Sequence, residues 1–293
     1  MGRAAMMAEG TSLASLPAQG EQAESQLQFQ KPVLIYMPCY NCAKKVVQTI
    51  REIPAELHDM IECFVVDNCS SDKTSAIVLE EIKAKRHPFR INLIQPKENI
   101  GFAGSQKLAL YIASLSANVK HVIVLHGDGQ YPPIMLKQFI PYLEKDFAIV
   151  NGHRSKRVYP DKEETPFITY SIIKFLSFCE SVLLGLPEKE WHSGLVMYKT
   201  EFLRKIPFQF LSPWMHIDGE FLMCAGVLKE KTFSVPIYKR YKGFDAFAGL
   251  GRLKYITHVL RLIWRFKRGY YHNFLRGANK AQIPYQFYIF NNC

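Results

Sequence analysis

Three side chains that can bind a metal alternate along one short loop, HGDGQYPP, as His126, Asp128 and Gln130. Alternate residues of an extended segment point to the same side, so these three can converge on one point. Gly127 and Gly129 let a ligand approach the backbone closely. Oxygen ligands suit a hard divalent cation such as Mg²⁺ or Mn²⁺. The loop therefore predicts a metal site that clamps a diphosphate, although Asp-Gly followed by two prolines is also typical of a surface turn.

Four apolar runs precede helical patterns along the first half of the chain and indicate alternating strands and helices. This alternation predicts an α/β fold with a mostly parallel, twisted sheet and helices on both faces. Ligands of such sheets bind at the carboxyl ends of the strands, so the loops after the four strands are expected to meet. The predicted strands are 33–37, 61–66, 91–94 and 121–125, and the predicted helices are 43–52, 73–85 and 101–115.

A carboxylate and a glycine-rich loop occur at the same predicted edge of the sheet. Asp67 ends the second strand, where a carboxylate can accept hydrogen bonds from a ribose or base, although Asp also caps helices. Gly101 and Gly104 lie at a predicted helix start, where backbone amides bind phosphate. The spacing predicts a nucleotide site beside the metal loop.

The composition indicates a globular protein with a distinct region at each end. Residues 1–30 lack the apolar run of a signal peptide and are predicted to be a disordered tail. The net charge of +11 predicts an anionic partner. Much of the excess lies beyond residue 236 among aromatic residues, and residues 241–293 are predicted to be basic amphipathic helices. This mixture favours a membrane surface or a phosphate over nucleic acid, for which no motif is present.

Two further features bear on location. Segment 167–186 is strongly apolar, but Lys174 and Glu180 interrupt it, which predicts a membrane-facing or core helix pair and no bilayer span. Seven scattered cysteines without a secretion signal favour free thiols in the cytosol. We expect a cytoplasmic protein, attached peripherally to the cytosolic face of a membrane.

Other side chains leave alternatives open. Cys39 and Cys42 have the spacing of a thioredoxin-like redox pair between a strand and a helix. The nine histidines show no zinc-site spacing, so His192 and His216 are expected either to line an acceptor pocket or to pack structurally.

The order of the motifs resembles family 2 glycosyltransferases with the Rossmann-like GT-A fold, in their dolichyl-phosphate mannose synthase-like branch. The resemblance covers residues 31–240, with a nucleotide-binding half at 31–151 and an acceptor half at 152–240. It rests on PCYN at 38–41, VVDNCSSD at 65–72, NIGFAG at 99–104, HGDGQYPP at 126–133, EWHSGLVMYKTEFL at 190–203, HIDGEFLMCA at 216–225 and VPIYKRY at 235–241.

The resemblance implies roles for individual residues. His126 stands where the family has the first acid of its Asp-x-Asp motif, and Cys42 where a Glu often stands. Histidine binds manganese better than magnesium, so the first departure bears on the metal's identity. The implied metal ligands are Asp128, Gln130 and His126; the implied catalytic residues are Asp128, Glu190 and Asp218; the implied donor nucleotide-binding residues are Pro38, Tyr40, Asn41, Asp67, Asn99, Gly101 and Asp128; and the implied acceptor or phosphate-binding residues are Arg154, Ser193 and Arg240.

The implied reaction is metal-dependent, inverting transfer of a sugar from a GDP- or UDP-linked donor to a polyprenyl phosphate at a membrane surface. Such an acceptor is already an anion, whereas a hydroxyl of a growing glycan or lipid-linked saccharide needs a base from among Glu190, Asp218 and Glu220. A non-catalytic nucleotide-sugar binding protein is a second alternative, and a basic nucleic-acid binder is a third.

Overall fold

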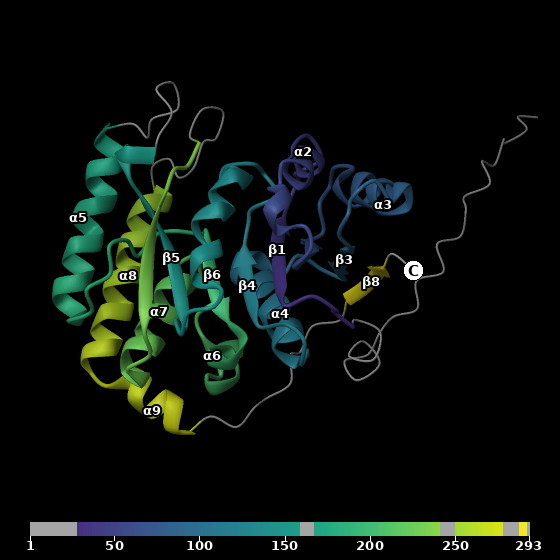
Figure 1. The fold of residues 1–293 in the computed structure, drawn as a ribbon. Coiled ribbons are helices and arrows are strands. Elements are labelled where there is room, and N and C mark those ends of the chain that lie inside the picture. Colours follow the sequence, from purple (N-terminus) through teal and green to yellow (C-terminus); the bar gives the residue numbers. More distant parts are fainter. Residues whose placement is uncertain (1–27, 159–166, 241–249, 278–286, 292–293) are drawn as a thin grey trace, which may run out of the picture.

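The computed structural model describes residues 28–158, 167–240, 250–277 and 287–291. Within them, eight strands form one sheet in the order β7-β5-β6-β4-β1-β2-β3-β8 (Figure 1). The central strands β4, β1, β2 and β3 run parallel, while β6 and β8 are antiparallel to their neighbours. The strands are β1 (Val33–Cys39), β2 (Ile61–Asp67), β3 (Ile91–Pro96), β4 (His121–Val124), β5 (Ile149–Arg154), β6 (Val196–Lys199), β7 (Thr232–Ile237) and β8 (Phe287–Asn291).

Helices cover both faces of the sheet, so the predicted fold class is confirmed. Short 3-10 turns accompany them, including Pro133–Gln138 after the metal loop. The α-helices are α2 (Val46–Arg51), α3 (Thr74–Ala84), α4 (Gly101–Leu115), α5 (Phe167–Leu184), α6 (Thr200–Lys205), α7 (Ile217–Leu228), α8 (Leu250–Lys267) and α9 (Tyr270–Gly277).

The alternation of side chains along β1 explains how the sheet joins two cores. Leu34 and Tyr36 point into the core shared with α4, α6, α7 and α8, while Ile35 and Met37 point into the core shared with α2 and α3. All four side chains are fully buried. A strand that is buried on both faces has a continuous run of apolar residues, which is why the sequence predicted β1.

Three regions differ from the expectations. The predicted tail, residues 1–30, reaches into the fold, because Phe29 is 1% exposed and packs edge-on against Phe64; residues 1–27 lie outside the described residues. The predicted helix pair in 167–186 is instead the single helix α5. The C-terminal region contains α8 and α9, as expected, and also β8, an unanticipated strand that pairs antiparallel with β3.

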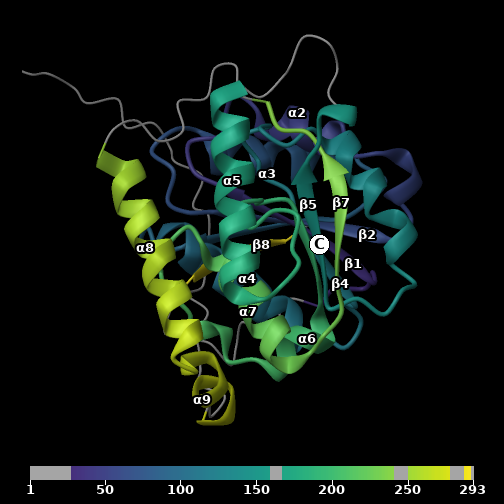
Figure 2. The same cartoon turned by 90° about the vertical axis from the view of Figure 1, so that its left-hand side faces the viewer.

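An outer layer formed by α5 and α8 covers one end of the molecule. The two helices lie side by side in front of the sheet (Figure 2) and contact each other. By length and composition alone, α5 is apolar enough to cross a membrane, with a mean hydropathy of 1.6, although the sequence argument excluded a span. Only 17% of this window is buried in the structure, and one side of α5 carries exposed apolar side chains.

Candidate active site

The loops that follow β1, β2, β3 and β4 lie together at one edge of the sheet, as predicted. We call residues 38–42, 67–73, 97–101 and 126–133 the loop edge. Hydrogen bonds connect the four loops. The Gly127 amide donates to the Pro38 carbonyl (3.2 Å), the Ser71 amide donates to the Asn41 side chain (2.9 Å), and the Asn68 side chain donates to the Asn99 side chain (2.9 Å). The four motifs are therefore parts of one site.

His126 lies between aromatic rings and a glycine. Its ring centroid is 5.7 Å from that of Phe102 and 5.2 Å from that of Tyr131. A Cβ added at Gly194 would lie 2.6 Å from Nε2 of His126, so the close approach requires glycine. Burial lowers the pKa of His126 to about 4, against the opposing effect of Asp128. The imidazole is therefore neutral at physiological pH, which is the form that binds metals.

The metal loop offers three ligand types. Nε2 of His126 is buried and has no hydrogen-bond partner among the described residues. Asp128 is partly exposed, and its Oδ1 accepts a hydrogen bond from the Gln130 amide (2.9 Å), which holds the carboxylate on the same turn. An unpartnered imidazole nitrogen near a carboxylate fits a divalent ion, and Gln130 follows on the same turn.

The segment after β7 brings positive charge to this loop. Nζ of Lys239 lies 5.1 Å from the ring centroid of Tyr131. The next residue, Arg240, donates its backbone N–H to the carbonyl of Gln130 (2.8 Å). Two cationic residues therefore follow one another beside the predicted metal ligands, where they can offset the charge of a diphosphate.

Asp67 has a structural role that the sequence left open. Its side chain is 1% exposed, and its two carboxylate oxygens accept hydrogen bonds from the hydroxyls of Ser70 and Ser75. The Ser70 amide also donates to it (3.1 Å). The carboxylate therefore shapes the loop before α3, although it does not cap the helix, whose N-cap residue is Lys73.

Asn41 and Asn99 likewise hold the loops in place. Asn41 has a left-handed backbone with φ 55°, and its side-chain oxygen accepts from both Ser71 and Asp72. Asn99 accepts from the Gly101 amide (2.9 Å) at the start of α4.

Other predicted nucleotide-binding positions are open to a ligand. Tyr40 is 55% exposed, and Gly101 is exposed with φ +71°. Pro38 is partly exposed between them and the metal loop, where its carbonyl binds Gly127. These residues form the accessible part of the loop edge.

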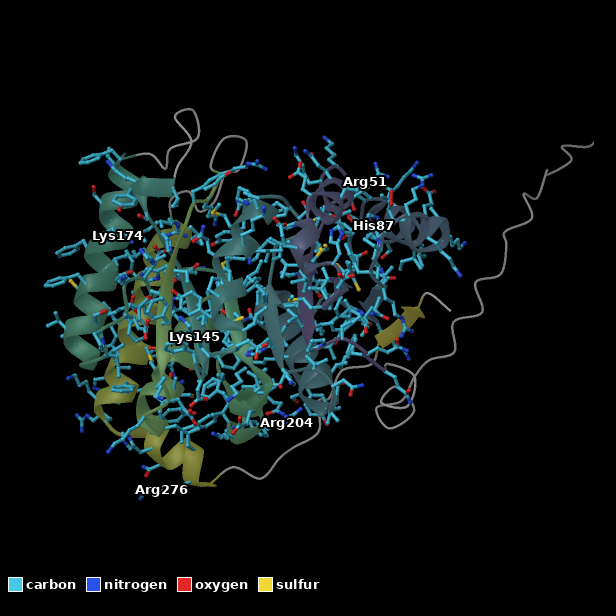
Figure 3. All side chains as sticks on the ribbon, viewed as in Figure 1. Arg51, His87, Lys145, Lys174, Arg204 and Arg276 are labelled. Atoms are coloured by element: carbon cyan, nitrogen blue, oxygen red, sulfur yellow. The ribbon has the colours of Figure 1, made fainter. Side chains whose placement is uncertain are left out.

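Glu190 and Arg154 form a buried ion pair, with Glu190 0% and Arg154 4% exposed. Their side chains are 2.8 Å apart, the Arg154 amide donates to Glu190 (2.7 Å), and Nζ of Lys174, labelled on α5 in Figure 3, lies 3.3 Å away. Burial alone would raise the pKa of Glu190, but these two cations hold it below its usual range. This geometry disfavours Glu190 as a base and Arg154 as a ligand for an external phosphate.

Asp218 and Glu220, on α7, differ in their surroundings. Oδ1 of Asp218 accepts hydrogen bonds from Gln106 (2.6 Å) and Tyr198 (2.5 Å), and burial raises its pKa. Glu220 accepts from the Ser212 amide (2.8 Å) and from Tyr271 (2.7 Å), so it anchors α9 to the domain. Of the candidate bases, Asp218 has the raised pKa that proton abstraction favours.

Ser193 and the Cys39–Cys42 pair are structural in character. Ser193 is 3% exposed, and its hydroxyl lies next to the backbone of Leu195. The Cys42 thiol and burial raise the pKa of Cys39 well above its usual range. The thiolate that redox chemistry needs is therefore disfavoured.

The family model for glycosyl transferase family 2 matches residues 34–209, which is more than half of the chain and includes the whole loop edge. The chain belongs to glycosyl transferase family 2. It is a glycosyltransferase. A relative among curated proteins, an uncharacterized protein of Methanocaldococcus jannaschii, is 25% identical over 177 residues, which cover 60% of this chain and 75% of that protein.

Solved structures share the fold of this family 2 transferase. Glucosyl-3-phosphoglycerate synthase from Mycobacterium tuberculosis, in complex with Mn²⁺, UDP and phosphoglyceric acid, matches with a TM-score of 0.55 and 13% identity, covering 87% of this chain and 84% of that one. A mannosyltransferase from Pyrobaculum calidifontis, in complex with GDP-Man and Mn²⁺, matches with a TM-score of 0.50 and 17% identity, covering 74% of this chain and 59% of that one.

Sequence reasoning missed Tyr131 in the transferase site and left the roles of two histidines undecided. Tyr131 accepts a hydrogen bond from the Gly194 amide (2.9 Å), which joins the metal loop to the segment before β6. His192 and His216, left between two roles by the sequence, both face Glu180 of α5. Tyr131 lies within the metal loop, whose Asp-Gly and two prolines indicate a turn, but no local pattern links it to Gly194, 63 residues away.

Proposed function

We propose that this glycosyltransferase is metal-dependent and inverting, and that it moves a sugar from a GDP- or UDP-linked donor to a polyprenyl phosphate at the cytosolic face of a membrane. This assigns it to the dolichyl-phosphate mannose synthase-like branch of the family. The observation that carries the acceptor proposal is the exposed apolar layer of α5 and α8 beside the catalytic domain.

The loop edge supports the donor part of the proposal. Tyr40 and Gly101 are accessible for a nucleoside, while Asn41, Asp67 and Asn99 hold the loops that present them. Pro38 links these loops to the metal loop. The neighbours' complexes with Mn²⁺ and UDP or GDP-Man are consistent with a donor of this class.

A divalent ion would be held by His126, Asp128 and Gln130, and when bound it would neutralise negative charge on the leaving diphosphate. The neutral imidazole of His126 favours manganese. Lys239 and Arg240 add positive charge at the same loop. Departure of the diphosphate is the step that these side chains assist, because they stabilise the charge that develops on it.

The outer face of α5 supports attachment to a membrane. Side chains project from its outer side, away from the sheet (Figure 3). Its inner side is fixed to the domain, because Glu180 is buried and Lys174 pairs with Glu190. A helix bound along one side suits an interfacial position better than a span. The exposed apolar side chains of α5 are Phe167 (71%), Ile168 (73%), Ile172 (48%), Phe175 (66%), Phe178 (65%), Val182 (62%) and Leu183 (43%).

The neighbouring α8 adds apolar and cationic groups. Leu260 and Trp264 are 55% and 58% exposed, and Arg268 lies over the Trp264 ring. Aromatic and basic side chains together suit the interface of an anionic membrane. An enzyme held there meets a lipid-linked acceptor without extracting it from the bilayer.

Vesicle flotation tests the membrane part of the proposal. The double variant Phe175→Glu/Phe178→Glu replaces two side chains that are 66% and 65% exposed, so its stability should change by about 0.5 kcal/mol per site. We expect it to lose binding to vesicles that contain anionic lipid. Leu115→Glu, at a 47% exposed position on α4, is the matched control and should bind like wild type. Equal binding by all three proteins would overturn the assignment.

Transfer assays test the acceptor. With GDP-mannose or UDP-glucose and Mn²⁺, we expect labelled sugar to move to dolichyl phosphate presented in vesicles. Transfer only to hydroxyl-bearing saccharides, with none to the polyprenyl phosphate, would contradict the proposed acceptor and leave the glycosyltransferase assignment intact.

A further inference from the structure

Four side chains from four separate segments form a closed ring between the outer layer and the catalytic domain. They are Glu180 of α5, His192 before β6, His216 before α7 and Tyr255 of α8. Nε2 of His192 and Nε2 of His216 lie 2.9 and 3.0 Å from the two carboxylate oxygens of Glu180. Their Nδ1 atoms lie 2.8 and 2.9 Å from the hydroxyl oxygen of Tyr255. Both imidazoles thus face the same acid and the same phenol.

Two of the ring's contacts are not hydrogen bonds. Nε2 of His192, Nε2 of His216 and both carboxylate oxygens of Glu180 are buried and have no hydrogen-bond partner among the described residues, although they lie 2.9 and 3.0 Å apart. Buried polar atoms are costly without a partner, and an additional cation between them, either a proton or a metal ion, would satisfy them.

We propose that Glu180, His192 and His216 bind a divalent transition metal ion, at a site separate from His126 and Asp128. The donor atoms lie within 4.8 Å of one another. Metal–ligand bonds of about 2.1 Å separate donor atoms by roughly 3 to 4 Å, so small side-chain movements close the site. Two imidazoles and one carboxylate suit Zn²⁺, Co²⁺, Fe²⁺ or Mn²⁺.

A metal explains the symmetry of the ring. With an ion at both Nε2 atoms, each histidine carries its hydrogen on Nδ1 and donates it to the Tyr255 oxygen, which has two lone pairs. Metal-binding histidines usually donate their other ring N–H to an oxygen in this way. An added proton would instead make the two imidazoles different, with one cationic ring buried near the Arg154 guanidinium, which donates to the His192 carbonyl (3.1 Å).

The site links the proposed membrane layer to the metal loop. Glu180 and Tyr255 belong to α5 and α8, while His192 is two residues before Gly194, which lies against His126. The side chains are well enclosed, since Glu180 is 2% and His216 1% exposed. An ion here would fix the segment 192–194 relative to both helices.

Cobalt substitution tests the proposal on the full-length, tag-free protein. After treatment with EDTA, titration with Co²⁺ should produce visible d–d absorption bands, which Zn²⁺ should abolish. In Asp128→Asn, where the proposed site remains, the bands should saturate at about one equivalent. The bands should be lost in Glu180→Gln and in His216→Gln. They should persist in Asp128→Asn, which lacks the donor-site carboxylate, and in His258→Gln, a matched histidine variant on α8 outside the ring.

Two results would contradict the proposed metal site. No bands in wild type would mean that a proton alone closes the ring, and bands that vanish in Asp128→Asn would assign the ion to the donor site. If Glu180→Gln fails to fold by circular dichroism, Tyr255→Phe serves in its place. It keeps all three ligands and should weaken Co²⁺ binding about 10- to 100-fold; unchanged affinity would contradict the proposed role of Tyr255.

Discussion

Replacing Glu190 with Gln tests whether this acid is structural, as its ion pair indicates, or a catalytic base, as the family resemblance implied. The substitution keeps the shape of the side chain and removes its charge. Arg154, which is 4% exposed, would then lose the carboxylate 2.8 Å from its guanidinium, and Lys174 would lose its partner at 3.3 Å. Removing one member of a buried pair costs about 3–5 kcal/mol, because the other charge is left buried and uncompensated.

Glutamine can still accept the hydrogen bond from the Arg154 amide, so we expect the lower end of this range, about 3 kcal/mol. For a domain of this size that corresponds to a fall in Tm of roughly 6–12 °C. Urea unfolding followed by circular dichroism gives the free energy of unfolding directly, and an unchanged m-value would show that the unfolded state is unaffected.

Glu188→Gln is the matched control. Glu188 is only two residues away, but burial raises its pKa, and it accepts a hydrogen bond from Thr232 that a carboxamide can also accept. We expect this variant to lose less than about 1 kcal/mol. The reasoning would be refuted if Glu190→Gln kept wild-type stability and lost sugar transfer, because Glu190 would then act in the chemistry and not in the fold.

Three further predictions concern other parts of the molecule. Burial lowers the pKa of His121 to about 4, so the unfolded chain binds a proton more tightly than the native state does. The free energy of unfolding, measured by urea titration, should therefore fall by up to roughly 3 kcal/mol as the pH drops from about 6.5 to about 4, and His121→Gln should lack this part of the loss. Gly194→Ala places a Cβ 2.6 Å from Nε2 of His126, so manganese-dependent donor binding, measured by calorimetry, should weaken at least about tenfold. Wild-type affinity in this variant would show that His126 is not a metal ligand. Asp218→Asn should leave transfer to a polyprenyl phosphate within a few fold, because that acceptor needs no base, whereas a loss of about 10²–10⁴ would indicate a hydroxyl acceptor.

Local patterns predicted the elements that hold the loop edge. The helix predicted at 101–115 is α4 to the residue, and the strand predicted at 61–66 is β2 without its last residue. Each is buried along most of its length, so hydrophobic periodicity reports it directly. Because parallel strands present their carboxyl ends at one edge, the meeting of the four loops also followed from the sequence.

Long-range contacts decided what the sequence left open. Glu190 was a candidate base until the structure placed Arg154, 36 residues earlier, against its carboxylate. The histidines at 192 and 216 lacked a spacing signal, because they are 24 residues apart and their shared partners, Glu180 and Tyr255, lie on two other helices. The strand β8 was missed since it depends on pairing with β3, almost 200 residues away.

Thermal shift with nucleotide sugars tests the central claim, that the loop edge binds a nucleoside-diphosphate sugar through a metal held at Asp128. At a donor concentration of 100 times Kd, binding stabilises the native state by about 2.7 kcal/mol, which raises Tm by roughly 5–10 °C. We expect one GDP- or UDP-linked sugar to do so in wild type with Mn²⁺, and to have no effect without metal or in Asp128→Asn. Equal stabilisation in the variant, or stabilisation that needs no metal, would contradict the account.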